Sequence, residues 1–365
     1  MIADPVDAAA GVGTSAPPHA PRLTLHGLPW PTDWAALFGR QAPLFVEIGF
    51  GRGDALLDLA RRHPEANVVG VEMSNRCLSA VERDAARRGL AHVKVVHATG
   101  QSALAHLFAP ASIDRLVVLF PDPWFKARHA HRRLLGEATV ALIASRLAPG
   151  AVLEAATDVA DYAAAIDAVL SAQPALRNAA PGGVPWLAER RSGAVTKYER
   201  LGLAAGRRCA YFHYERGPLA APDRPVIAES AMPHVALRTA AVTPAAVAAA
   251  FRPRRLAVAD RHIHLQAVYA GASGLLVDTV VVEPTIAQHV AIGVHARADG
   301  AWVVSLATIG QPRATLGCHL AVALVGRWLL EAAPDAAVAA GAVSLDPAAR
   351  TVLDRPLTTA GPTQA

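Results

Sequence analysis

The clearest pattern in the chain is an alternation of short apolar runs with segments of helical spacing. Residues 44–48 form an apolar run that Gly49 ends, and residues 54–62 then place apolar side chains at helical spacing. The same alternation predicts further strands at 68–71, 93–96, 116–120 and 151–157, and helices at 79–88, 102–107 and 134–147. It is typical of an α/β fold, an open parallel sheet with helices on both faces, whose ligands bind at the carboxyl ends of the strands.

A different pattern follows Arg216. After three prolines at 218, 222 and 225, strand-like runs at 254–258, 263–269, 275–282, 290–296 and 302–308 follow one another closely, and one helix is predicted at 316–332. This pattern predicts a smaller α+β domain with an antiparallel meander. We therefore expect a flexible tail at 1–32, a first domain at 33–217, a linker at 218–232, a second domain at 233–345 and a flexible tail at 346–365.

Composition and charge narrow the class of protein. The chain is 53% hydrophobic and 18% charged, which excludes wholesale disorder, and its three cysteines lie too far apart to suggest a disulfide framework. Apolar runs are shorter than the roughly 20 residues of a membrane span, so we expect a soluble, cytoplasmic protein. Lys and Arg exceed Asp and Glu by 24 to 20 in residues 1–217 and by 11 to 10 in residues 218–365. Any polyanionic partner should therefore meet the first part.

The first strand ends in a glycine-rich turn between two carboxylates. Gly49, Gly51 and Gly53 follow Glu47, and Glu72 stands nineteen residues beyond the last glycine, where a carboxylate can hold a ribose diol. The third glycine is displaced from its position in dinucleotide-binding loops, and Glu47 would oppose a pyrophosphate. The arrangement favours a cationic cofactor such as S-adenosylmethionine. Alternatively, these are glycines of a tight turn beside an exposed glutamate.

A second candidate site follows the strand at 116–120. Two prolines flank Asp122, Trp124 comes next, and a basic run extends from Lys126 to Arg133. Cations suit phosphate, an aromatic ring can flank a base, and a carboxylate can accept from the N–H groups of a base. This combination favours nucleic acid, although a solvated charged loop would have the same composition.

The motifs together resemble one family. They are Glu47-Ile-Gly-Phe-Gly-Arg-Gly, Val69-Gly-Val-Glu72, Phe120-Pro-Asp-Pro-Trp124 with Lys126, Arg128 and His129, Ala156-Thr-Asp158 with Tyr162, and Thr196-Lys-Tyr-Glu199 with Gly202. In this order, over residues 33–216, they resemble the bacterial tRNA guanine-N7 methyltransferases. The resemblance implies a Rossmann-like, S-adenosylmethionine-dependent enzyme that methylates N7 of a guanine in the tRNA variable loop.

The resemblance also assigns residues. It implies cofactor contacts from Glu47, Gly49, Gly51, Gly53, Glu72, Thr99 and Asp122, with Asp122 also in the active site. It implies substrate contacts from Lys126, Asp158, Thr196, Lys197, Tyr198 and Glu199. The basic run adds phosphate contacts that we expect from Lys126, Arg128, Arg132 and Arg133, which cannot all face a packed core. No residue is expected to bind a metal. The spacing of His262, His264, His289 and His295 on predicted strands would allow a metal cluster, but they are interpreted as ordinary strand histidines.

The expected chemistry needs no strong base. Guanine N7 has a free lone pair, so catalysis should depend on placing N7 in line with the methyl group. Asp122 would hold the N1–H and amine of the guanine, or offset the positive charge that develops on the ring, and the sequence does not choose between these roles.

The chain also departs from the family pattern. Thr99 occupies the position where the family has Asp or Asn for the adenine, and the basic arm before the first strand is reduced to Arg22 and Arg40. The second domain has no counterpart in the short bacterial members, and a basic patch at 252–255 is its best candidate for an RNA contact.

Two other interpretations remain open from the sequence. The second domain could select a different RNA, protein or small-molecule substrate, or the chain could be a non-catalytic RNA-binding derivative. The sequence does not indicate an oligomeric state.

Overall fold

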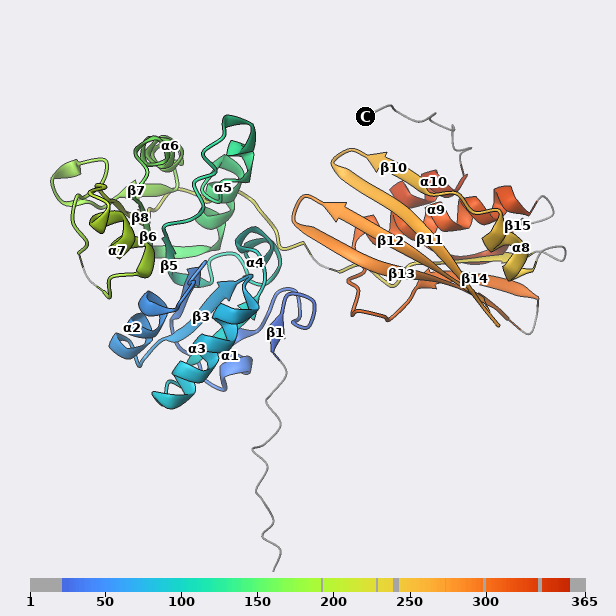
Figure 1. The fold of residues 1–365 in the computed structure, drawn as a ribbon, viewed down its shortest axis with the longest axis horizontal. Helices are drawn as coiled ribbons and strands as arrows, with labels where there is room; N and C mark the ends of the chain where they lie inside the picture. The colour runs from blue at the N-terminus through green and yellow to red at the C-terminus, as the bar shows by residue number, and fades with distance from the viewer. Residues whose placement is uncertain are drawn as a thin grey trace, which may run out of the picture.

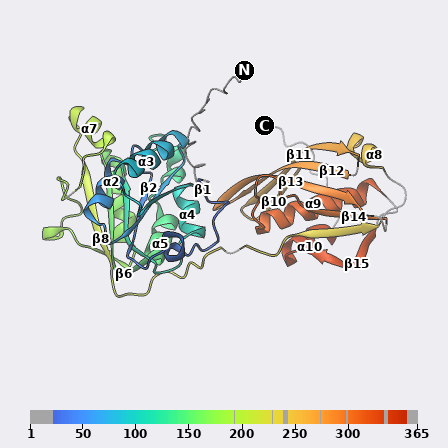
Figure 2. The ribbon, with the colours of Figure 1, turned by 90° about the horizontal axis from the view of Figure 1, so that it is seen from below.

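The protein has two sheets, which lie side by side in space and follow one another along the chain (Figure 1). The structure is a computed structural model that describes residues 22–354 except 192, 228, 239–242, 273, 298–299 and 334–336. Figure 2 shows that one extended crossing of the chain leads from the first part to the second. Residues 1–21 of the expected tail at 1–32, and residues 355–365 of the expected tail at 346–365, lie outside the described residues.

The first sheet has the order β1-β4-β3-β2-β5-β6-β8-β7. Its strands are β1 (Leu23–Thr24), β2 (Leu44–Ile48), β3 (Asn67–Glu72), β4 (Val93–His97), β5 (Ile113–Leu119), β6 (Leu147–Thr157), β7 (Leu176–Asn178) and β8 (Ala210–Arg216). Its helices are α1 (Trp34–Phe38), α2 (Asp54–Arg62), α3 (Asn75–Arg87), α4 (Gly100–His106), α5 (Glu137–Arg146), α6 (Ala160–Ser171) and α7 (Lys197–Ala204), with short 3-10 turns at Ala127–Arg132 and Pro181–Gly183. The predicted Rossmann-like α/β architecture is confirmed.

Two strands at one edge correct the expectation of a wholly parallel sheet. The pairs from β1 to β6 are parallel, whereas β8 runs antiparallel to both β6 and β7. In β8, buried and partly buried residues alternate, which is the pattern of a strand with one covered face. After α7 the chain returns as β8 along β6, and Arg200 of α7 pairs with Asp54 at the start of α2.

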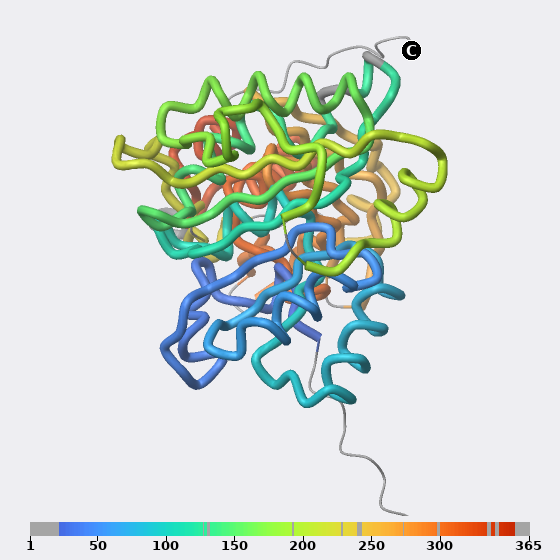
Figure 3. The backbone as a smooth tube through the Cα atoms, turned by 90° about the vertical axis from the view of Figure 1, so that its left-hand side faces the viewer, coloured from blue at the N-terminus to red at the C-terminus, as the bar shows by residue number. Residues whose placement is uncertain are grey.

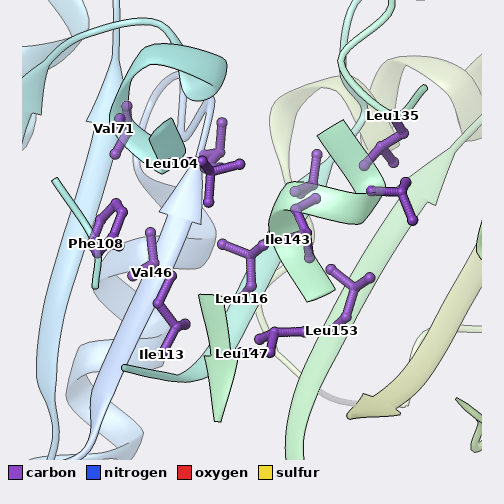
Figure 4. Close-up of a cluster of buried hydrophobic side chains, with 14 of the residues drawn as sticks. Val46, Val71, Leu104, Phe108, Ile113, Leu116, Leu135, Ile143, Leu147 and Leu153 are labelled. Carbon is purple, nitrogen blue, oxygen red and sulfur yellow. The ribbon is translucent and has the colours of Figure 1, made fainter. Parts of the chain in front are cut away.

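Helices cover both faces of the first sheet. Leu104 of α4 and Ile143 of α5 pack on Val46, Leu116 and Leu153 of the central strands (Figure 4). A second cluster joins α2 and α3 to the opposite face through Leu56, Val81 and other buried side chains. Because both faces are covered, the central strands are mostly apolar, as their sequence predicted, with Glu47 of β2 as a buried exception.

The second sheet is antiparallel throughout, in the order β10-β11-β12-β13-β14-β9-β15. Its strands are β9 (His234–Arg238), β10 (Arg254–Val258), β11 (Arg261–Gly271), β12 (Gly274–Glu283), β13 (Ile286–Ala296), β14 (Ala301–Leu306) and β15 (Ala337–Ser344), and its helices are α8 (Pro244–Ala249), α9 (Leu316–Ala332) and α10 (Pro347–Asp354). The predicted meander is confirmed from β10 to β14. The buried helix α9 packs on this sheet through Trp328 and its neighbours. Figure 3 shows this part behind the strands of the first.

Both predicted tails include residues that pack against the rest of the structure. Residues 22–32 pair with the sheet through β1 and bury Leu25, Leu28 and Trp30, whose indole N–H donates to the Leu25 carbonyl at 2.9 Å. Near the other end, α10 buries Ala349 and Leu353 against α9. The apolar residues of both segments are too few to show a period, so only their packing reveals them. Among the described residues, no helix is long and apolar enough to cross a membrane.

Candidate active site

The glycine turn joins β2 to α2 and is shaped by two different requirements. Gly49 and Gly51 have φ angles of 73° and 53°, and a Cβ on either would meet nothing within 4 Å. Gly53 has φ 79°, but a Cβ there would lie 2.3 Å from Cγ2 of Val81. The first two glycines therefore give the turn its left-handed backbone and leave open space above it, whereas the third lets α2 pack closely on α3.

Glu72 closes this turn from the end of β3. Its Oε2 accepts from the N–H of Gly51 at 3.0 Å, and its Oε1 accepts from the N–H groups of Met73 at 2.8 Å and Ser74 at 2.9 Å. These three bonds use three of the four acceptor positions of the carboxylate. The side chain is held beside the glycine turn with acceptor capacity left for a ligand hydroxyl.

Glu47 lies directly beneath the turn and is almost completely buried. It is 2% exposed, and its Oε2 has no hydrogen-bond partner. Burial raises the pKa of Glu47 to about 8, a shift that the positive charge of Arg190 opposes. A buried carboxylate without a partner is costly unless a ligand supplies a donor or a positive charge. Glu47, Glu72 and the open glycines thus fit a cationic ligand with a ribose diol, as S-adenosylmethionine is.

Asp122 stands in a constrained loop after β5. Phe120 and Trp124, one before and one after the Pro-Asp-Pro turn, have φ angles of 50° and 45°, which non-glycine residues rarely adopt. The Phe120 N–H donates to the Ala156 carbonyl at 2.8 Å, so neighbouring strand β6 holds the start of the loop. Asp122 itself is exposed. The backbone therefore fixes the loop while leaving this carboxylate free to meet a substrate.

The basic run divides into two kinds of residue. Arg133 donates to the Pro123 carbonyl at 2.8 Å and lies 4.9 Å from the ring centre of Tyr162, and Arg132 lies 5.1 Å from the ring centre of Trp124. These contacts brace the Asp122 loop. Lys126 and Arg128 are exposed, and Nε of Arg128 donates to Nε2 of neighbouring His129 at 3.0 Å. The sequence did not distinguish Arg133, which is partly buried, from the exposed Lys126, Arg128 and Arg132.

The segment 196–199 begins α7 with reciprocal hydrogen bonds. The Thr196 hydroxyl accepts from the N–H of Glu199 at 3.3 Å, and the Glu199 carboxylate accepts from the N–H of Thr196 at 3.1 Å. Glu199 is 2% exposed and also bonds Arg190 and the Tyr211 hydroxyl. Burial alone would raise the pKa of Glu199, but these hydrogen bonds hold it below its ordinary value.

This packing distinguishes the four predicted residues of the segment. Thr196 and Glu199 build the start of the helix, whereas Lys197 and Tyr198 are exposed, with the Lys197 ammonium 5.3 Å from the Tyr198 ring centre. Arg200 of α7 pairs with Asp54 of α2 at 3.2 Å, which places the segment beside the glycine turn. Sequence reasoning missed the supporting Arg190 and Tyr211, although the Thr-x-x-Glu spacing is a recognisable capping signal.

Asp158 and Thr99 complete the predicted set. Asp158 follows β6 and pairs with Arg207 at 2.8 Å, and a Cβ on Gly202 would lie 2.7 Å from its carboxylate. Thr99 follows β4 as the N-cap of α4, where its hydroxyl accepts from the N–H of Ser102 at 3.1 Å. Because the strands from β4 to β6 are parallel, these residues, the glycine turn, Glu72 and Asp122 share one edge of the sheet.

No three metal-ligating side chains come together among the described residues. His289 pairs with Asp278 on the second sheet, away from this edge.

Comparison with known proteins agrees with this geometry. A family described as "Putative methyltransferase" matches residues 41–211. A tRNA (guanine-N(7)-)-methyltransferase of Burkholderia cenocepacia is 41% identical over 186 residues, which are 51% of this chain and 72% of that protein. One of Mycolicibacterium gilvum is 45% identical over 183 residues, 48% of this chain and 68% of that protein. The C-terminal portion has no match. The chain therefore belongs to the tRNA (guanine-N7)-methyltransferase family.

Proposed function

We propose that this enzyme methylates N7 of a guanine in tRNA, in the variable loop. The observation that supports this most strongly is the unpartnered, buried oxygen of Glu47 beneath an open glycine turn, at the same sheet edge as the exposed Asp122. The buried Glu47 carboxylate would be stabilised by a positively charged ligand. The Asp122 carboxylate faces solvent in a loop whose backbone is held in place. This pair suits a reaction between a cationic methyl donor and a nucleobase.

The cofactor is S-adenosylmethionine, which supplies an electrophilic methyl group on a sulfonium. Glu47 would balance its positive charge, and Glu72 would accept from its ribose hydroxyls with the acceptor capacity that remains. Gly49 and Gly51 would let the cofactor approach the backbone closely, because neither residue has a Cβ in the open space above the turn. Thr99 would border the adenine with a hydroxyl that already caps α4.

The guanine requires positioning rather than deprotonation. Its N7 lone pair forms the new bond to the methyl carbon while the carbon–sulfur bond breaks, and the positive charge passes to the base. Asp122 can hold the N1–H and amine of the guanine or offset this charge. Its braced loop fixes the carboxylate in advance, which is how positioning accelerates such a reaction.

The exposed cations would hold the RNA. Lys126 and Arg128 stand next to the Asp122 loop, and Lys197 and Tyr198 project from the start of α7. Cations suit phosphates, and the Tyr198 ring, 57% exposed, offers a surface on which a base can stack. We assign these contacts to a methyltransferase domain that ends near residue 217, with the second sheet as an accessory domain.

The test is transfer of labelled methyl groups into unmodified tRNA, followed by digestion to nucleosides. We expect the label in N7-methylguanosine. Label in another nucleoside, or in protein or a small molecule, would instead support a substrate chosen by the second domain. Cofactor binding with no transfer to any substrate would support a non-catalytic derivative.

A further inference from the structure

The turn between β12 and β13 is anchored in the methyltransferase part of the molecule. Ile286 is 5% exposed and belongs to the core cluster of the first sheet. The Thr285 hydroxyl lies 3.0 Å from Nε2 of His106, which is fully buried at the end of α4. Figure 1 shows this end of the β12–β13 hairpin beside α4. The second domain therefore reaches the first through a fixed contact.

A cavity of about 630 Å³ lies where the two parts meet. Its lining residues come from the loop after β4, from the segment that leads into α5, and from the β12–β13 turn. They include Thr99, Gln101, Arg133, Glu137, Glu283 and Ala287. The second domain thus supplies one complete wall of the cavity.

The cavity adjoins the active site through Arg133. This arginine lines the cavity and also donates to the Pro123 carbonyl, the residue after Asp122. Glu47, Glu72 and the glycine turn do not line the cavity, whereas Thr99, which would border the adenine of the cofactor, does. A group that enters this space would contact the loop that presents the guanine, next to the adenine end of the cofactor site and away from Glu47 and Glu72.

The lining chemistry fits a nucleotide. Arg133 brings a positive charge for a phosphate, Gln101 offers hydrogen bonds to ribose and base, and Pro284 offers an apolar surface. The lining also holds the carboxylates of Glu137 and Glu283, which can accept from the N–H groups of a base. We propose that the cavity holds a nucleotide that flanks the methylated guanine, with the β12–β13 turn as the wall that selects it. This inference rests on the proposed function.

This location differs from the basic patch that the sequence favoured. Arg254 is paired with Glu331 at the far end of α9, at 2.7 Å. Glu283, by contrast, accepts from the N–H of Gly317 at the first turn of the same helix, at 3.0 Å. The patch and the cavity therefore lie toward opposite ends of α9, and only the cavity meets the methyltransferase part.

The first experiment fills the cavity from the accessory side in the full chain. Ala287 is exposed and lines the cavity, so Ala287→Trp would occupy it, and Ala257→Trp changes a similarly exposed alanine on β10 outside it. We expect Ala287→Trp alone to raise the Kd for tRNA roughly tenfold, as for one lost charge-assisted contact, with unchanged affinity for S-adenosylmethionine. Unchanged tRNA affinity, or a loss of cofactor affinity instead, would overturn the inference.

The second experiment measures protection of a reporter cysteine. In a Cys77→Ser background, Ala287→Cys and the control Ala257→Cys are alkylated with and without tRNA or S-adenosylmethionine. We expect tRNA alone to slow alkylation at position 287 and neither ligand to affect position 257. If wild-type enzyme methylates the same tRNA at guanine N7 but position 287 is not protected, this inference fails and the proposed function stands. If wild-type enzyme does not methylate it, the proposed function fails.

Discussion

The buried carboxylate of Glu47 makes a quantitative prediction about stability. Its pKa rises from 4.5 to about 8 on folding because burial disfavours the ionised form. Between these values the folded chain keeps a proton that the unfolded chain releases, so its stability falls as pH rises. pH 7 lies about 2.5 units above the pKa of this carboxyl in the unfolded chain. Keeping Glu47 protonated in the folded chain at pH 7 therefore costs about 3 kcal/mol of folding stability.

Glu47→Gln removes this titration and keeps the shape of the side chain. In the absence of cofactor we expect the variant to gain stability relative to wild type, by about 3 kcal/mol near pH 7 and by little near pH 4. Urea unfolding across this pH range measures the gap. Glu189→Gln, at an exposed position, is the control and should show no such pH-dependent gap. A gap for Glu47→Gln that stays constant with pH would refute the reasoning.

The same substitution should weaken the cofactor complex. A neutral amide cannot balance a sulfonium or ammonium, so we expect S-adenosylmethionine to bind at least roughly tenfold more weakly to Glu47→Gln. In wild type, calorimetry should show affinity that rises with pH until about pH 8, because binding favours the ionised carboxylate. If Glu47→Gln lost stability and bound S-adenosylmethionine as tightly as wild type, Glu47 would have a structural role in the core instead of a role in cofactor binding.

Three further predictions concern the other site residues. Asp122→Ala should lower kcat by roughly 10²-fold with cofactor affinity unchanged. Asp122→Asn should recover activity only if the residue positions the guanine without needing its negative charge. A wild-type rate for Asp122→Ala would show that the residue only forms the turn. Glu72→Gln should weaken S-adenosylmethionine binding roughly tenfold by calorimetry, because a carboxylate that accepts ribose hydroxyls is lost, and equal affinity in the folded variant would end that assignment. Lys126→Ala with Arg128→Ala should reduce the slope of log tRNA affinity against log salt by a little under one unit per lost phosphate contact, and an unaltered slope would remove these residues from the RNA interface.

Local pattern was sufficient for the central part of the fold. The helix at 54–62 and the strand at 44–48 have the predicted bounds, because an apolar run and a helical period are strong signals when both faces of the sheet are covered. The helix at 316–332 also has its predicted bounds. The antiparallel strand β8 and the short segments β1 and α10 were not predicted, because the burial of their residues depends on the elements that they pack against.

Some residues of the candidate site could be predicted from the sequence, and others could not. The glycines, Glu72 and Asp122 could be placed from sequence because they follow strands, and parallel strands bring such positions to one edge. The bracing role of Arg133 and the buried pair of Arg190 with Glu199 depend on contacts between loops. The burial of Ile286 in the core of the first domain has no local signal at all, because it depends on how the second domain packs.

The central claim concerns a single atom, and replacing that atom tests it directly. A tRNA transcript made with 7-deazaguanosine keeps the shape and pairing of guanosine but has carbon in place of N7. We predict that the enzyme transfers methyl groups from S-adenosylmethionine to the ordinary transcript and none to the 7-deaza transcript, although both compete equally for binding. Equal methylation of the two transcripts would contradict the account.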